Sequence, residues 1–223
     1  MSDSTSSGRW IPLECNPEVL NSWANNAGLE PKAFQFNDVY GFDEELLAMV
    51  PKPVKAVLLL FPISEPLEMK RKEEDEKIHE STVGGHRKDI VWIKQTSKVS
   101  LKPGSPLDQF VQVCRDKSPA DRAQLLETTP LFANIHAVAA GTGQSAVPTN
   151  LDTDLHFTCF VASSGEAGTR IWELDGRRKG PVDRGLVNAE FLKDVANMIK
   201  ETYVAQSSSI QFGMVALGPP AEW

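Results

Sequence analysis

The chain has 223 residues, of which 41% are hydrophobic and 24% charged, and this composition is typical of one globular domain. A net charge of −7 argues against binding to nucleic acid or to an anionic membrane, because both require a basic face. Three cysteines without a CxxC pair argue against a disulfide framework and a zinc site. We therefore expect a disordered tail at 1–8 and a single domain at 9–223. We expect this domain to be monomeric, to hold no metal or cofactor, and to lie in the cytoplasm or nucleus. The N-terminus lacks signal-peptide character, and no apolar run reaches the length of a bilayer span.

The N-terminal part alternates helix signals with one long apolar run. Asn16 followed by Pro17 predicts the cap and first turn of a helix that stops at Gly28. Asp43 is placed to cap a second, brief helix. Residues 55–63 (KAVLLLFPI) form a continuous apolar run, which predicts a central strand covered on both faces.

A charged stretch and a second apolar run come next. Residues 68–88 carry a dense charge run and a Gly-Gly pair, which predicts a mobile surface loop. His79 and His86 lie among cations there, so we do not expect them to bind a metal. Residues 90–93 (IVWI) predict a buried strand that delivers Gln95 to its polar end, where sites are common.

Three helices and a long loop are predicted in the middle of the chain. The first buries a stripe made of Leu107, Phe110, Val111 and Cys114. The second starts at Ser118, and the third covers 129–140. Residues 141–154 are too long and too rich in small residues for a simple connection, so they are a candidate functional loop.

The C-terminal part predicts a hairpin, a helix and a last strand. Residues 155–162 and 169–174 form the hairpin, Asn188 caps the helix, and 210–217 form the strand. Strands and helices are intermixed without repeats, so the fold class is α+β or mixed α/β, with a central, mainly antiparallel sheet flanked by helices.

Two polar residues lie at matching ends of the hairpin. His156 begins the first strand and Asp175 ends the second, and antiparallel pairing brings these ends together. A His-Asp pair is the base and its orienting partner in a nucleophile-His-Asp system. The alternative is structural: a half-buried histidine, and an aspartate that caps the turn at Gly176.

A set of segments, in this order, resembles the ubiquitin C-terminal hydrolases, papain-like cysteine proteases that act at the C-terminus of ubiquitin: RWIPLECNPEVLNSWANNAGL, NDVYGFDEELLAMVPKPVKAVLLLFPIS, KQT, DLHF and WELDGR. The resemblance implies a knotted papain-like fold, thiol-dependent cleavage of amides, esters or isopeptides, and ubiquitin or a ubiquitin-like protein as partner. It implies that Gln95 is the oxyanion-hole donor, His156 the general base and Asp175 its orienter. Residues 141–154 would be the crossover loop that restricts the leaving group.

The same resemblance implies four substrate-binding residues. Asp38 would meet an arginine of the basic ubiquitin tail. Glu14, Leu155 and Phe212 would line the channel or the ubiquitin face. Structural alternatives stand beside these roles, because Phe212 can be a core residue and Glu14 can simply flank a helix.

The chain departs from the family where the nucleophile should be. The family continues from Lys-Gln-Thr into an Asn-Ala-Cys-Gly helix start, whereas this chain continues as SKVSLKPGSPL, so a helical segment is missing after 96. No cysteine lies between Gln95 and Cys114. Cys114 and Cys159 have core patterns and Cys15 precedes a helix cap, so none is a convincing nucleophile.

Three explanations stay open at this stage. The sequence belongs to a hydrolase whose product here lacks its nucleophile, to a non-catalytic ubiquitin-binding module, or to a splice or gene-model variant of an active hydrolase. Loss of a buried helix would cost more than a domain can spare unless other segments repack. We therefore expect marginal stability or disorder around 95–104.

Overall fold

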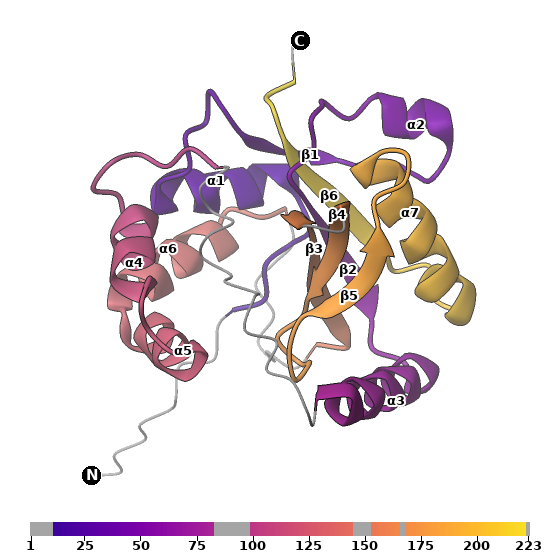
Figure 1. The fold of residues 1–223 in the computed structure, drawn as a ribbon. Helices are drawn as coiled ribbons and strands as arrows, with labels where there is room; N and C mark the ends of the chain where they lie inside the picture. Colours follow the sequence, from indigo (N-terminus) through magenta and orange to yellow (C-terminus); the bar gives the residue numbers. More distant parts are fainter. Residues whose placement is uncertain (1–10, 83–98, 145–152, 166–167, 222–223) are drawn as a thin grey trace.

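The computed structural model describes residues 11–82, 99–144, 153–165 and 168–221 (Figure 1). The predicted tail, the predicted strand at 90–93, Gln95 and most of the loop at 141–154 lie outside the described residues.

One six-stranded sheet forms the centre of the molecule, in the order β1-β6-β2-β3-β4-β5. Every neighbouring pair is antiparallel. The strands are β1 (Gln35–Asp38), β2 (Ala56–Pro62), β3 (Leu155–Gly165), β4 (Gly168–Leu174), β5 (Val182–Leu186) and β6 (Gly213–Gly218). The predicted mixed α/β class with an antiparallel-rich sheet is confirmed, and so is the hairpin. β5 was not predicted.

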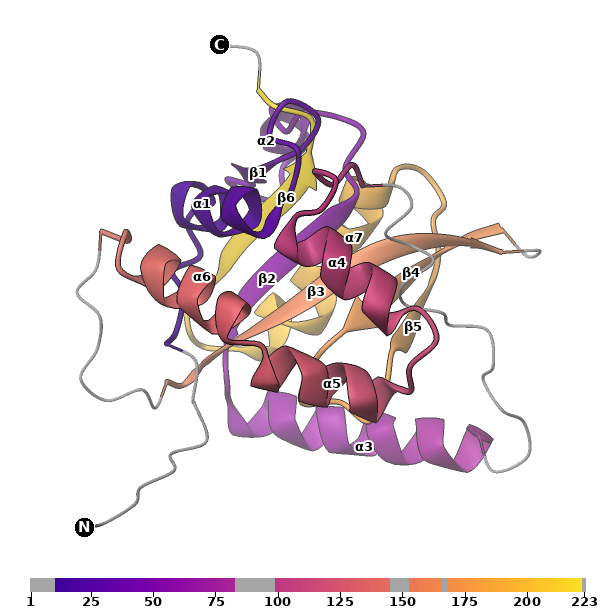
Figure 2. The ribbon, with the colours of Figure 1, turned by 90° about the vertical axis from the view of Figure 1, so that its left-hand side faces the viewer.

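Seven α-helices flank this sheet within the described residues. They are α1 (Pro17–Ala27), α2 (Glu44–Ala48), α3 (Glu65–Thr82), α4 (Pro106–Cys114), α5 (Pro119–Thr128), α6 (Pro130–Ala140) and α7 (Phe191–Thr202). Figure 2 shows α1, α4, α5 and α6 in front of the sheet and α7 behind it. None of the described helices has the length and apolarity to cross a membrane.

The central position predicted for β2 is confirmed, but its coverage on both faces is wrong. Val57, Leu59 and Phe61 are buried, whereas Leu58 and Leu60 are only partly buried. Because side chains alternate along a strand, the buried set shares one face, and there it joins the core formed with α7 and α2. On the other side, α1 packs against α6 and β1 rather than closely against the middle strands. The second face is therefore only half covered.

Several helices begin at the capping signals in the sequence. The Asn16 side chain accepts a hydrogen bond from the Glu18 amide, and Gly28 ends α1 with φ 116°, a left-handed value that favours glycine. α2 begins after Asp43 as predicted, although the Asp43 side chain makes no capping bond. The predicted helices that bury the stripe from Leu107 to Cys114, start at Ser118 and cover 129–140 are confirmed as α4, α5 and α6.

Two C-terminal boundaries differ from the prediction. The residue that caps α7 is Glu190 rather than Asn188. The amide of Asn188 instead donates to the Asp194 carboxylate at 2.7 Å, so the capping carboxylate comes from inside the helix. The last strand starts at Gly213, and Ile210 is 95% exposed, because residues 207–212 form turns before the sheet is reached.

The predicted loop at 68–88 is wrong for its first part, which lies in α3. Its charges are spaced as helical pairs: Arg71 bonds Glu68 at 3.0 Å and Asp75 at 3.3 Å. Arg177, beyond β4, bonds Glu68 at 2.8 Å and ties the helix to the sheet. Glu68, Arg71 and Asp75 thus form one ionic face of α3.

Disorder at 95–104 is not found in the part that the structure describes. The amide of Glu30 donates to the Ser100 carbonyl at 3.1 Å, and that of Lys102 donates to the Gly28 carbonyl at 2.8 Å. These bonds attach 100–102 to the end of α1. Residues 95–98 lie outside the described residues.

Candidate functional site

His156 and Asp175 form a hydrogen-bonded pair, so the proximity expected from the hairpin is confirmed. His156 is the second residue of β3, and Asp175 follows the last residue of β4. Histidine Nε2 lies 2.6 Å from Asp175 Oδ1. The aspartate side chain is 2% exposed and the histidine side chain 21% exposed. With Nε2 engaged, Nδ1 is the ring nitrogen available to a reacting group.

The turn role of Asp175 is also present. Its Oδ1 accepts a hydrogen bond from the Arg177 amide at 2.7 Å, as in an Asx turn. Burial favours the neutral acid, but the hydrogen bonds from His156 and Arg177 outweigh it and hold the pKa of Asp175 below its ordinary value. The geometry of this one carboxylate is compatible with both interpretations left open by the sequence, and the catalytic role stays a prediction.

A pH dependence of stability follows from this lowered pKa. The contribution of Asp175 is fully present above the unfolded-state pKa of about 3.9 and is lost as the pH falls through the lower folded-state pKa. We expect Asp175→Asn to weaken the acid dependence of the free energy of unfolding between about pH 4 and 2. Urea unfolding of both chains across that range measures it. Identical pH slopes would show that the pair adds nothing to stability.

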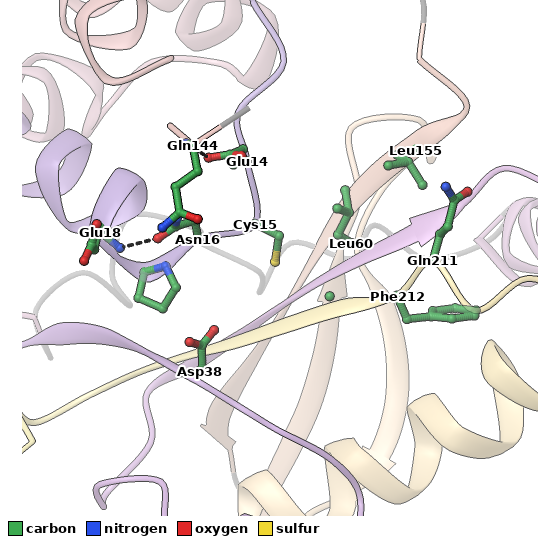
Figure 3. Close-up of a pocket in the computed structure, with 12 residues that line it drawn as sticks. Glu14, Cys15, Asn16, Glu18, Asp38, Leu60, Gln144, Leu155, Gln211 and Phe212 are labelled. Carbon is green, nitrogen blue, oxygen red and sulfur yellow. Dashed lines mark hydrogen bonds between the residues drawn. The ribbon is translucent and has the colours of Figure 1, made fainter. Parts of the chain in front are cut away.

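A pocket of about 650 Å³ lies at the same end of β3 (Figure 3). It brings together all four residues named as substrate-binding candidates, Glu14, Asp38, Leu155 and Phe212. The other lining residues are Cys15, Asn16, Pro17, Glu18, Leu60, Gln144, Gln211 and Gly213. Phe212 also packs against the core, so its structural alternative holds as well. The binding roles themselves stay predictions.

The pocket is acidic. Among the residues that the structure describes, its lining contains three carboxylates, Glu14, Glu18 and Asp38, and no lysine, arginine or histidine. Burial raises the pKa of Asp38, because desolvation disfavours the charged form of a carboxyl group. Glu14 accepts a hydrogen bond from the Gln144 amide at 2.8 Å, and this bond joins the start of the long loop to the pocket wall. Such a lining is suited to a basic ligand.

The pocket and the His-Asp pair lie on opposite faces of one strand. Leu155 lines the pocket, whereas His156 lines a much smaller cavity of about 20 Å³ with Phe61 and Tyr203. Strand alternation explains this, because neighbouring residues point to opposite faces. The two features meet at the start of β3.

The three cysteines do not supply a reactive thiol next to His156. Burial, with a smaller effect of the Asp38 charge, raises the pKa of Cys15 to about 11. Burial raises the pKa of Cys159 to about 12, and Cys159 lies on the other face of β3 from His156. Cys114 is fully buried in α4. Because the thiolate is the nucleophile, Cys15 and Cys159 are held in the unreactive form near neutral pH.

Sequence reasoning missed the polar residues Gln144 and Gln211 of the pocket wall. Both lie in irregular segments, where no periodicity in the sequence indicates which side chains point inward. The one indication of function was the position of Gln144 in the candidate functional loop. No group of three His, Cys, Asp or Glu in the described part of the chain is arranged to hold a metal ion.

Comparisons with known proteins agree in one family. The family model described as ubiquitin carboxyl-terminal hydrolase, family 1, matches residues 10–101 and 97–204. Ubiquitin carboxyl-terminal hydrolase 3 of Arabidopsis thaliana is 37% identical over 235 residues, covering 97% of each chain. Human isozyme L1 is 31% identical and covers 92% of this chain and 96% of its own. The Trichinella spiralis UCH37 catalytic domain, solved with ubiquitin vinyl methyl ester, has the same fold, with a TM-score of 0.68, 19% identity and coverage of 98% and 99%.

The family match falls into two pieces that meet at residues 97–101. The alignment with the Arabidopsis relative is also longer than this 223-residue chain, so the relative carries residues that this chain lacks. The break between the two pieces lies where the sequence departs from the family motif, and the longer alignment is consistent with a block missing from this chain. On fold, matched length and sequence identity, the chain belongs to the ubiquitin carboxyl-terminal hydrolases of family 1, which are cysteine-type deubiquitinases.

Proposed function

We propose that this chain binds the C-terminal tail of ubiquitin in the acidic pocket, and that it keeps part of the hydrolase site without completing the covalent step. The observation that carries the proposal is the gathering of Glu14, Asp38, Leu155 and Phe212 around one pocket beside the start of β3. The solved relative with ubiquitin vinyl methyl ester supports ubiquitin as the partner class.

The proposed roles follow from charge and hydrogen bonding. The Asp38 carboxylate pairs with an arginine of the ubiquitin tail. The apolar side chains of Leu155 and Phe212 contact the aliphatic part of that tail. His156 acts as general base through Nδ1, and Asp175 orients its ring. Gln95 is the oxyanion donor in this proposal, on family position alone.

The missing nucleophile limits the chemistry. Without a thiolate, no acyl-enzyme bond to the ubiquitin carbonyl can form, so bound ubiquitin is released unchanged. We further propose a monomer of the cytoplasm or nucleus that binds ubiquitin or a ubiquitin-like protein and binds neither nucleic acid nor membrane. The net charge of −7 supports the last two points.

Calorimetric titration with ubiquitin tests the binding. We expect Asp38→Asn to weaken binding about tenfold or more, since a hydrogen bond to a charged group contributes about 1.5–3 kcal/mol. Asp43→Asn is the matched control, because Asp43 is exposed and does not line the pocket. Ubiquitin truncated before its tail arginines should lose the effect of Asp38→Asn. Equal affinity for full and truncated ubiquitin would place the binding surface elsewhere and refute the proposal.

A further inference from the structure

Glu173 is a fully buried carboxylate that the proposed chemistry does not use. It lies on β4, two residues before Asp175, and is 0% exposed. The Tyr203 hydroxyl donates to Glu173 Oε1 at 2.6 Å, and Arg184 Nε donates to Oε2 at 2.6 Å. A buried charge needs such partners, so the position of the Tyr203 hydroxyl is strongly fixed.

Tyr203 connects this buried charge to the His-Asp pair through two aromatic contacts. Its ring lies 4.9 Å from that of Phe61, centroid to centroid, and Phe61 stands edge-on to the His156 ring at 5.6 Å and 85°. Phe61 and His156 are also register partners on β2 and β3. The imidazole is thus bounded by Phe61 on one side and bonded to Asp175 at Nε2.

The order of these contacts has a physical consequence. Tyr203 is 4% exposed, and burial together with the Glu173 charge raises the pKa of its hydroxyl, so it stays a neutral donor. A ring held at its hydroxyl end leaves Phe61 little freedom, and packed rings transmit such restraint to their neighbours.

We propose that Tyr203 is a positioning residue for His156: its hydroxyl bond to Glu173 fixes the ring that supports Phe61, and Phe61 holds the imidazole in the orientation that bonds Asp175. The inference rests on the base role given to His156 under the proposed function. It assigns no contact with ubiquitin to Tyr203.

Nuclear magnetic resonance of the His156 ring tests this without substrate. In Tyr203→Phe we expect the Nε2 proton, assigned by its loss in His156→Ala, to exchange with solvent about tenfold faster than in the unaltered chain. Tyr40→Phe is the control, because Tyr40 is 66% exposed. An unchanged exchange rate in a folded Tyr203→Phe chain would overturn the proposal.

A second variant separates positioning from general loosening. Phe61→Leu removes the edge-on contact and leaves the bond between Tyr203 and Glu173, so we expect a similar acceleration. Adding Tyr203→Phe to Phe61→Leu should then have no further effect, since both act through one contact. Fully additive effects would refute the route through Phe61. If the Tyr203→Phe chain does not fold, an unchanged exchange rate of the Nε2 proton in Phe61→Leu is by itself enough to refute the route through Phe61. Failure of ubiquitin binding leaves this readout untouched, so the two proposals fail separately.

Discussion

The 223-residue chain is expected to leave a fluorogenic amide at the ubiquitin C-terminus uncleaved, and the segment that it lacks is expected to restore turnover. Inserting the corresponding segment of the Arabidopsis relative at 97–101, where the two family matches meet, should raise the rate by about 10⁴–10⁶-fold. The reason is that removal of the nucleophile removes the covalent step, and no thiol of this chain stands in for it next to His156. Initial rates on purified protein of both lengths measure the effect.

Two controls make this experiment decisive. His156→Ala in the lengthened chain should abolish the restored turnover, whereas Glu44→Ala, at an exposed position of α2, should not change it. Turnover by the unaltered chain that disappears with His156→Ala would show a substitute nucleophile. Cys15→Ser would then test the pocket thiol. Restored activity would favour a splice or gene-model variant of an active hydrolase over gradual loss of function.

The proximity of His156 and Asp175 was predictable because a hairpin fixes which residues are neighbours. Once residues 155–162 and 169–174 are assigned as paired strands, their matching ends must meet. The hydrogen bonds that lower the pKa of Asp175 were only half foreseen, since the Arg177 amide depends on turn geometry.

The pocket was predictable only through the family resemblance. Glu14, Asp38, Leu155 and Phe212 come from four separate parts of the chain, and no local pattern brings them together. α3 was missed for a different reason: several of its carboxylates form ion pairs with Arg177, Arg178 and Arg184, residues distant in sequence. Ion-pair partners that are distant in sequence cannot be identified from the charge run alone.

The half-covered face of β2 has a related cause. The apolar run at 55–63 predicts a strand that is buried on both faces. Hydropathy indicates which side chains a strand can bury, but not which elements cover them. In this chain the family match breaks at 97–101, and Leu58 and Leu60 are left partly exposed.

The largest effect on stability is expected at Glu173. Glu173→Ala removes one of the two carboxylate partners of Arg184, leaving Glu74 at 3.0 Å, and removes the acceptor of the Tyr203 hydroxyl. It also removes the nearest carboxylate of Arg178 Nε, which lies 3.8 Å away and has no hydrogen bond. Removing one member of a buried ionic cluster costs about 3–5 kcal/mol, because the remaining charges stay desolvated. Since domains unfold with about 5–15 kcal/mol, this variant should lose a large share of the free energy of unfolding.

Urea unfolding monitored by circular dichroism measures this loss of unfolding free energy. Two further variants serve as comparisons. Glu44→Ala removes an ion pair of the same type with Lys193, but the Glu44 side chain is 82% exposed, so its unfolding midpoint should not change. Glu173→Gln keeps an acceptor for Tyr203 and should lose less than Glu173→Ala. A change below about 1 kcal/mol in Glu173→Ala would mean that water or a rearranged Glu74 replaces the carboxylate. In that case the restraint on Tyr203 would also be weaker than its geometry indicates, because the fixed position of its hydroxyl depends on the same buried charge.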